Sequence, residues 1–142
     1  MEIVCSSCGT QNTLLDAKPL ASAVCGQCQN PLMPNKPVEL TDANFLPFLG
    51  GTDAPVLVYF YAPHCATCRS VGPRFEELAK NTPQLLAAKL NTVSQYRTVQ
   101  AIGLRGIPAL ALYHQGKQVA LHAGNISAPD MQTWLEGALK IA

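Results

Sequence analysis

Apolar and polar positions are arranged differently in the two parts of this chain. Up to about residue 36, large apolar side chains are too few to form a core, and glycine, serine, glutamine and asparagine are frequent. Prolines concentrate over 30–37, as in a short linker. From residue 37 onward, strand-like apolar runs alternate with segments of helical periodicity. This pattern predicts a small N-terminal unit, residues 1–36, followed by an α/β domain, residues 37–142.

The clearest element is the run Val56–Tyr61, which is β-branched and aromatic and carries no charge. Such a run is typical of a central strand covered on both faces. The last helix is equally clear, because Ser127 and Asp130 form a capping-box pattern ahead of an apolar stripe. Other expected elements are, in order, a strand over 38–40, a brief helix capped by Thr41 or Asp42 and stopped at Gly50 and Gly51, a helix over 65–81, a strand over 85–90, a short helix including 99–102, and a hairpin of strands 109–113 and 118–122.

Composition excludes several classes of protein. The 142 residues are 48% hydrophobic, which is too apolar for a disordered chain. The net charge is +1 and the basic residues are scattered, so no nucleic acid partner is expected. No apolar run approaches the roughly 18 residues of a membrane span, and the N-terminus lacks the pattern of a signal peptide. We therefore expect a cytoplasmic protein with no membrane partner. Nothing in the sequence requires a permanent dimer, so a monomer is expected.

All six cysteines occur in Cys-x-x-Cys pairs, and two of these pairs lie in the polar N-terminal segment. Sixteen residues separate the first pair from the second, a spacing typical of a zinc site with four thiolate ligands. Four cysteines leave no open coordination position, so such a zinc ion is structural and would support folding of this segment. Two local disulfides and four free thiols are the alternatives. The expected ligands are Cys5, Cys8, Cys25 and Cys28.

The third pair, Cys65 and Cys68, lies where the predicted central strand leads into a helix. Free amides and the macrodipole at a helix N-terminus favour a thiolate and lower the pKa of a cysteine there to about 3.5–7.5. Cys65 is nearest that end and is the expected nucleophile, and Cys68, one turn further along, can attack the resulting mixed disulfide. A third metal-binding pair and two inert core thiols are the alternatives. Metal binding is disfavoured because no second pair remains to complete the shell.

Several segments are similar, in order and spacing, to the landmarks of the thioredoxin family: residues 38–45, the strand and the Cys65-x-x-Cys68-Arg69 motif, residues 88–91, residues 103–108, and Gly124. The resemblance covers about residues 37–142. With the N-terminal cysteine pairs added, the chain resembles the zinc-ribbon thioredoxins of bacteria. It implies a thioredoxin fold, a central mixed sheet flanked by helices, preceded by a small zinc ribbon.

The same resemblance implies a substrate groove beside the cysteine pair. The bond between Ile107 and Pro108 is expected to be cis and to face that pair. The backbone of Ile107 would then be a docking edge for an extended substrate strand, and Gly124 would line the same groove.

The residues around the third pair depart from the family pattern Trp-Cys-Gly-Pro-Cys, because the chain reads His64-Cys65-Ala66-Thr67-Cys68. A protonated His64 beside Cys65 would stabilise the thiolate and make the pair more oxidising. The alternative is that His64 is an exposed loop residue of small effect. Ala66 and Thr67 change the start of the helix and can shift the reduction potential in either direction.

A further departure concerns the buried aspartate that the family carries six positions before the nucleophile. Here that position is Tyr59, while Lys89 remains where the family keeps the partner of the aspartate. Without the carboxylate, the expected proton acceptor for Cys68 is missing, so release of the mixed disulfide should be slower. Tyr59 can hydrogen-bond to Lys89 but is a poor base near neutral pH.

The leading hypothesis is a thiol-disulfide oxidoreductase, a protein-disulfide reductase that exchanges two electrons through Cys65 and Cys68 in cell redox homeostasis. It needs structural zinc but no organic cofactor. The resemblance implies oxidised proteins as substrates and electron transport from a thioredoxin-reductase-like flavoenzyme. The alternatives are a binding or holdase module with little turnover, and a redox sensor in which oxidation of the N-terminal cysteines ejects zinc.

Overall fold

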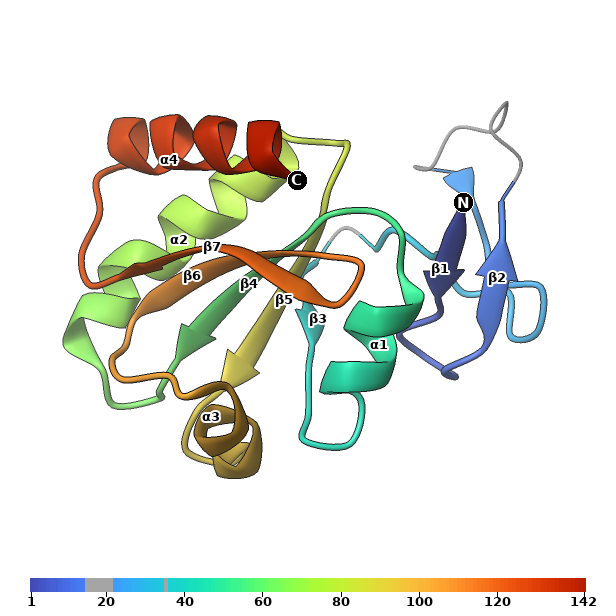
Figure 1. Ribbon diagram of the computed structural model, residues 1–142, viewed down its shortest axis with the longest axis horizontal. Coiled ribbons are helices and arrows are strands. Elements are labelled where there is room, and N and C mark those ends of the chain that lie inside the picture. The colour runs from blue at the N-terminus through green and yellow to red at the C-terminus, as the bar shows by residue number, and fades with distance from the viewer. Residues whose placement is uncertain (15–21, 35) are drawn as a thin grey trace.

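A computed structural model describes residues 1–14, 22–34 and 36–142 (Figure 1). Residues 15–21, in the predicted zinc ribbon, and residue 35, in the predicted linker, lie outside the described residues. The elements are, in order, β1 (Glu2–Val4), β2 (Gln11–Thr13), β3 (Val38–Glu39), α1 (Phe45–Gly51), β4 (Val56–Tyr61), α2 (Ala66–Lys80), β5 (Leu86–Asn91), α3 (Tyr96–Ile102), β6 (Ala109–His114), β7 (Lys117–Ala123) and α4 (Ala128–Ile141).

The main sheet has five strands in the order β3-β5-β4-β6-β7. Strand β5 is parallel to both β3 and β4, whereas β6 is antiparallel to β4 and to β7. Helices α2 and α4 pack on one face of this sheet and α1 and α3 on the other (Figure 1). The predicted fold class, a mixed sheet flanked by helices, is therefore confirmed.

Strand β4 is the central strand that its apolar run predicts. Its side chains alternate between the faces, so that Val58 and Phe60 join the core beneath α1, while Leu57 and Tyr59 join the core beneath α2 and α4. Burying each large apolar side chain contributes about 1.5–3 kcal/mol. The alternation matters for function, because it places Tyr59 directly under the helix that carries the cysteine pair.

The N-terminal residues form a small second sheet, in which β1 pairs antiparallel with β2. Ile3 and Val4 of β1 are buried in the same hydrophobic cluster as Phe48 of α1. The backbone is tied across as well: the Asp53 N–H donates to the Glu2 carbonyl over 2.7 Å, and the Glu2 N–H donates to the Asp53 carboxylate over 2.6 Å. The two sheets therefore share one hydrophobic core.

Helix α1 differs from its prediction at both ends. Its N-cap is Asn44, not Thr41 or Asp42, because Thr41 and Asn44 exchange side-chain to backbone hydrogen bonds of 2.6 and 3.1 Å in the preceding turn. The carboxylate of Asp42 instead accepts from Thr98 of α3. At the other end, the two predicted stop glycines lie within the last turn of the helix.

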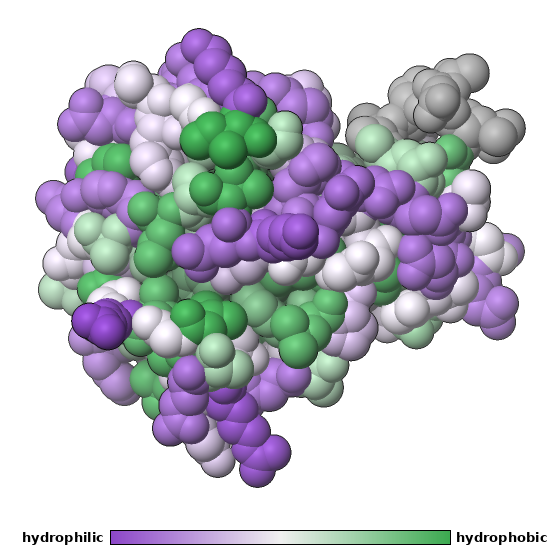
Figure 2. Space-filling view, viewed as in Figure 1, coloured by the Kyte–Doolittle hydropathy of each residue, from purple (hydrophilic) through white to green (hydrophobic). Residues whose placement is uncertain are grey.

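The ends of the remaining helices and strands agree with the predicted ends to within one or two residues. The exception is α3, which begins at Tyr96, three residues before the predicted segment 99–102. Ser127 caps α4 by accepting from the Asp130 N–H over 3.3 Å, as the capping pattern predicts. None of the helices in the described part of the chain has the length and apolar character required to span a bilayer. On the face seen in Figure 2, apolar residues are interspersed with polar ones.

Candidate redox and metal sites

The Cys65–Cys68 pair forms a disulfide at the N-terminus of α2. Cys65 is the N-cap residue, in extended conformation, and its Sγ accepts the backbone N–H of Cys68 over 3.2 Å. Cys65 is partly exposed, whereas Cys68 is buried. A sulfur at this position faces the free amides and the positive end of the helix dipole, which favour a thiolate once the disulfide is open. The accessible sulfur is thus the one that lies at the helix N-terminus.

The segment before β6 lies beside the end of β4 from which the Cys65 loop leaves. Ala109 of β6 pairs with Phe60 near the end of β4, and the Ile107–Pro108 bond immediately before it is cis, as expected. The Gly124 N–H donates to the Pro108 carbonyl over 2.8 Å. Gly124 has a φ of +98°, which glycine adopts without strain. Ile107 is 36% exposed, so its side chain is accessible to solvent.

Three of the residues that depart from the family pattern lie on the surface. His64, Ala66 and Thr67 are all exposed around the disulfide. This exposure agrees with the interpretation of His64 as a solvent-exposed loop residue. The suggested effect of its protonation on the Cys65 thiolate stays a prediction.

Tyr59 reaches the cysteine pair from below. It is buried on β4, and its hydroxyl donates to the backbone carbonyl of Cys68 over 2.8 Å. The ring stacks on Phe75 of α2 and on Tyr61, with centroid separations of 5.2 and 5.6 Å. Burial, followed by the nearby Tyr61 and Glu76, raises the pKa of Tyr59 to about 12. The hydroxyl is therefore a neutral hydrogen-bond donor and not a base at physiological pH.

Tyr59 and Lys89 do not form the hydrogen bond with each other that the sequence suggested. Lys89 Nζ lies 3.3 Å from a carboxylate oxygen of Glu39, on the adjacent strand β3, and 5.7 Å from the centroid of the Tyr61 ring. The Tyr61 hydroxyl donates to the same oxygen over 3.1 Å. Glu39 carries no local sequence signal as the partner of Lys89, because its pairing opposite Lys89 depends on the register between β3 and β5.

The four N-terminal cysteines converge on one point. Their Sγ atoms all lie within 4.8 Å of one another, and the Cys5–Cys28 and Cys8–Cys25 sulfurs are 3.6 Å apart. Tetrahedral zinc with bonds of about 2.3 Å would place its sulfurs about 3.8 Å apart. The cluster can therefore hold a metal ion such as zinc.

Amides of the residues around the cluster donate to the sulfur of Cys25. The pKa of Cys25 is lowered to about 6, chiefly by the backbone N–H of Cys28. The backbone N–H of Gln27 and the side-chain amide of Asn12 also donate to this sulfur, over 3.4 and 3.5 Å. Donors of this kind stabilise the thiolate that a metal ion requires.

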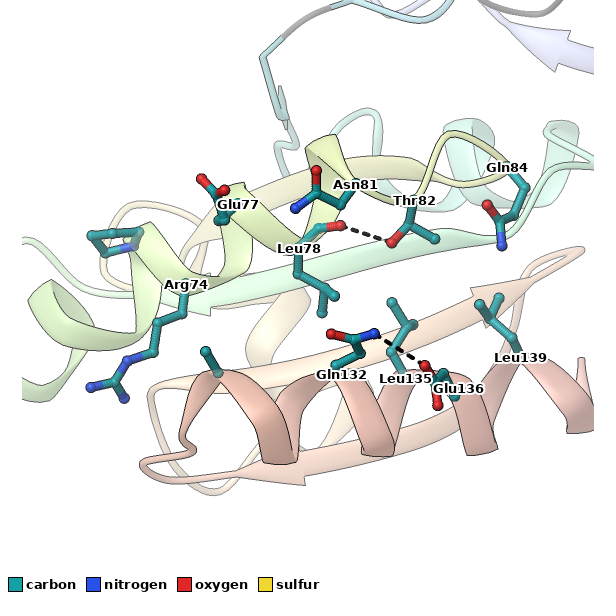
Figure 3. Close-up of a pocket in the computed structure, with 12 residues that line it drawn as sticks. Arg74, Glu77, Leu78, Asn81, Thr82, Gln84, Gln132, Leu135, Glu136 and Leu139 are labelled. Atoms are coloured by element: carbon teal, nitrogen blue, oxygen red, sulfur yellow. Dashed lines mark hydrogen bonds between the residues drawn. The ribbon is translucent and has the colours of Figure 1, made fainter.

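A groove of about 470 Å³ runs between α2 and α4 (Figure 3). Leu78, Leu135 and Leu139 point into it, and its lining also includes Glu77 and Glu136. Neither cysteine of the disulfide lines this groove. The groove is thus separate from the redox pair.

Comparison with known proteins agrees with this geometry. The thioredoxin family model matches residues 36–137. Thioredoxin C-3 of Corynebacterium nephridii is 36% identical over 140 residues, covering 99% of this chain and 97% of that protein. Thioredoxin-like protein slr1139 of Synechocystis sp. is 34% identical over 103 residues, covering 72% of this chain and 94% of that protein. Thioredoxin 1 of Nostoc sp. is 31% identical over 99 residues, covering 69% and 92%. The chain therefore belongs to the thioredoxin family.

Proposed function

We propose that this protein is a thiol-disulfide oxidoreductase of the zinc-ribbon, thioredoxin 2 type, which reduces protein disulfides through Cys65 and Cys68. One observation carries the proposal: a partly exposed Cys65 sulfur caps α2 and accepts the Cys68 N–H, in a chain of the thioredoxin family. Such a sulfur is an accessible, stabilised nucleophile with a second thiol within reach.

The reaction proceeds in two exchanges. The Cys65 thiolate attacks one sulfur of the substrate disulfide; that bond breaks, a Cys65–substrate disulfide forms, and the first substrate thiolate leaves and takes a proton from water. Cys68 then loses its proton to water and attacks the Cys65 sulfur. The Cys65–Cys68 disulfide forms, and the second substrate thiolate leaves and is protonated. The substrate gains two electrons and two protons, and the cysteine pair loses them.

The partners follow from this chemistry. Oxidised proteins would dock an extended segment against the edge formed by Ile107, Pro108 and Gly124, with His64 beside the reacting sulfur. A thioredoxin-reductase-like flavoenzyme would return the electrons, so the protein itself needs no organic cofactor. We place it in the cytoplasm as a monomer that binds neither nucleic acid nor membranes.

The N-terminal unit, residues 1–36, would be a zinc ribbon attached to the thioredoxin domain, residues 37–142. The four converging sulfurs support a zinc ion held by Cys5, Cys8, Cys25 and Cys28. Four thiolates would close its shell and leave no position for substrate, so the ion would stabilise the fold.

A second candidate, a binding or holdase module with little turnover, is favoured by the chemistry of Tyr59. Its hydroxyl is neutral at physiological pH and donates to the Cys68 carbonyl, so it supplies no base to the Cys68 thiol. Release of a bound partner would then be slower than with a carboxylate at this position. The third hypothesis, a zinc-linked redox sensor, requires zinc to leave under mild peroxide; retention of the metal would end it.

Insulin-disulfide reduction with dithiothreitol separates the enzyme from the binding module. Wild type should exceed the background, Cys65→Ser should fall to it, and Ser70→Ala, an exposed change in the same helix, should match wild type. Background activity in all three proteins would favour the binding module.

A further inference from the structure

The space beneath the Cys68 end of α2 is filled by an aromatic side chain instead of a small acid. Tyr59 stands on the central strand and sends its hydroxyl 2.8 Å from the carbonyl oxygen of Cys68. Stacking on Phe75 and Tyr61 holds the ring on two sides. The donor therefore points at the backbone of the resolving cysteine in one defined orientation.

Gly72 provides the room for this side chain. It lies four residues after Cys68, on the next turn of α2. A Cβ at Gly72 would lie 3.4 Å from the Tyr59 hydroxyl oxygen and 3.6 and 3.7 Å from two ring carbons, so that a single methyl group would just touch it. A β-branched side chain, which adds two carbons to that Cβ, is therefore expected to press on Tyr59. By contrast, a Cβ at Gly137, the glycine of α4, would meet nothing within 4 Å.

We propose that Tyr59 is a positioning residue for the resolving step, and that Gly72 admits it. Its hydroxyl holds the Cys68 carbonyl and so keeps the Cys68 thiol near Cys65 when the disulfide is open. This inference rests on the proposed function, since it concerns the second of the two exchanges. Tyr59 would thus act as an anchor, by which we mean that its hydrogen bond fixes the Cys68 backbone, although it cannot act as a base.

The chemical consequence is a higher effective concentration of the Cys68 thiol. The Cα atoms of the two cysteines are 5.2 Å apart in the oxidised protein. After reduction, anything that restricts the Cys68 backbone keeps the two Cα atoms near this separation and favours closure of the disulfide, because less conformational freedom is lost on ring closure. The anchor should therefore act on closure of the disulfide and not on the first attack by Cys65.

A two-phase kinetic experiment tests the anchor. Reduced protein is mixed in a stopped-flow instrument with an aromatic disulfide that releases a coloured thiolate at each exchange. The first phase reports attack by Cys65, and the second reports closure by Cys68. Tyr59→Phe keeps the ring and removes only the hydroxyl. It should slow the second phase about fivefold, the usual effect of one hydrogen bond, and leave the first unchanged.

Equilibrium with glutathione measures the reduction potential of the cysteine pair independently of the kinetics. A purely structural role for Tyr59 would not change this potential in parallel with the rate of the second phase. Weaker closure by about fivefold makes the pair easier to reduce, and raises its reduction potential by about 20 mV. Gly72→Val should act in the same direction on the second phase and the potential. Gly137→Val, which carries the same helix penalty at an open position, should change neither.

Three results would overturn the inference: a second phase in Tyr59→Phe equal to wild type, an equal slowing of both phases, or equal effects of the two valine variants. If wild type shows no first phase, the proposed reductase function fails instead. In that case the reduction potential, measured at equilibrium with glutathione, tests the positioning role of Tyr59 by itself. An unchanged potential in Tyr59→Phe would then overturn that role.

Discussion

Two neighbouring glycines at the end of α1 test whether the N-terminal sheet is part of the stable fold. A Cβ built at Gly51 would lie 2.5 Å from Val4 Cγ2 and 3.0 Å from Gln11 Oε1, so the Val4 side chain in β1 would have to shift. A Cβ at Gly50, in the same helical turn, would meet nothing within 4 Å. The pair of alanine variants therefore differs in the contact with the N-terminal sheet.

The magnitudes follow from general packing energetics. Replacing a helical glycine by alanine stabilises a helix by up to about 1 kcal/mol, and Gly50→Ala should show most of this gain. Gly51→Ala has the same helical gain but overpacks a buried contact, which costs about 1–3 kcal/mol. We expect Gly51→Ala to be less stable than Gly50→Ala by about 2 kcal/mol, or about 4–8 °C in Tm for a chain of this size.

Urea unfolding of the zinc-loaded protein measures this difference. The single tryptophan, Trp134, packs against the core beneath α2 and α4, so its fluorescence reports on the distant face of the main sheet. Gly51→Ala should shift the tryptophan transition, because Ile3 and Val4 belong to the core shared with α1. Equal stability of the two variants, or a Gly51→Ala transition confined to signals other than tryptophan fluorescence, would refute the shared core.

Further predictions concern the cysteine turns, zinc and pH. Gln29 has a φ of +67°, in the left-handed region that favours glycine. Gln29→Gly should therefore raise the free energy of unfolding by about 1 kcal/mol, measured as a higher urea midpoint. Zinc removal by a chelator should lower the free energy of unfolding, and Cys5→Ser should abolish the response to zinc; an equally stable metal-free protein would contradict the zinc ribbon. Burial raises the pKa of Tyr59 and of Tyr113 to about 12. Because unfolded tyrosines ionise near pH 10, stability should fall between about pH 10 and 12, with a smaller slope in Tyr59→Phe; equal slopes would contradict the assignment.

Elements with a local signal could be predicted well. The central strand, the capped helix α4 and the β6–β7 hairpin depend on short apolar runs, capping and turn residues that lie together in the sequence. The hairpin turns at Gln115 and Gly116, both with positive φ, as such turns require. Strands β1 and β2 were not among the expected elements, because each is only three residues long. Strand β1 is held by packing against α1, and β2 by its pairing with β1.

Sequence alone was enough to separate two kinds of cysteine pair, because the spacing of the pairs and their position relative to a strand and a helix are local properties. Tertiary structure alone decided how the departures from the family pattern are accommodated. Tyr59 and Lys89 lie opposite each other on β4 and β5. Nevertheless, Tyr59 hydrogen-bonds to the Cys68 carbonyl, and Lys89 forms an ion pair with Glu39. The first contact depends on the room that Gly72 leaves for the Tyr59 side chain, and the second on the register of β3 against β5. Both arise only when segments distant in the sequence pack together.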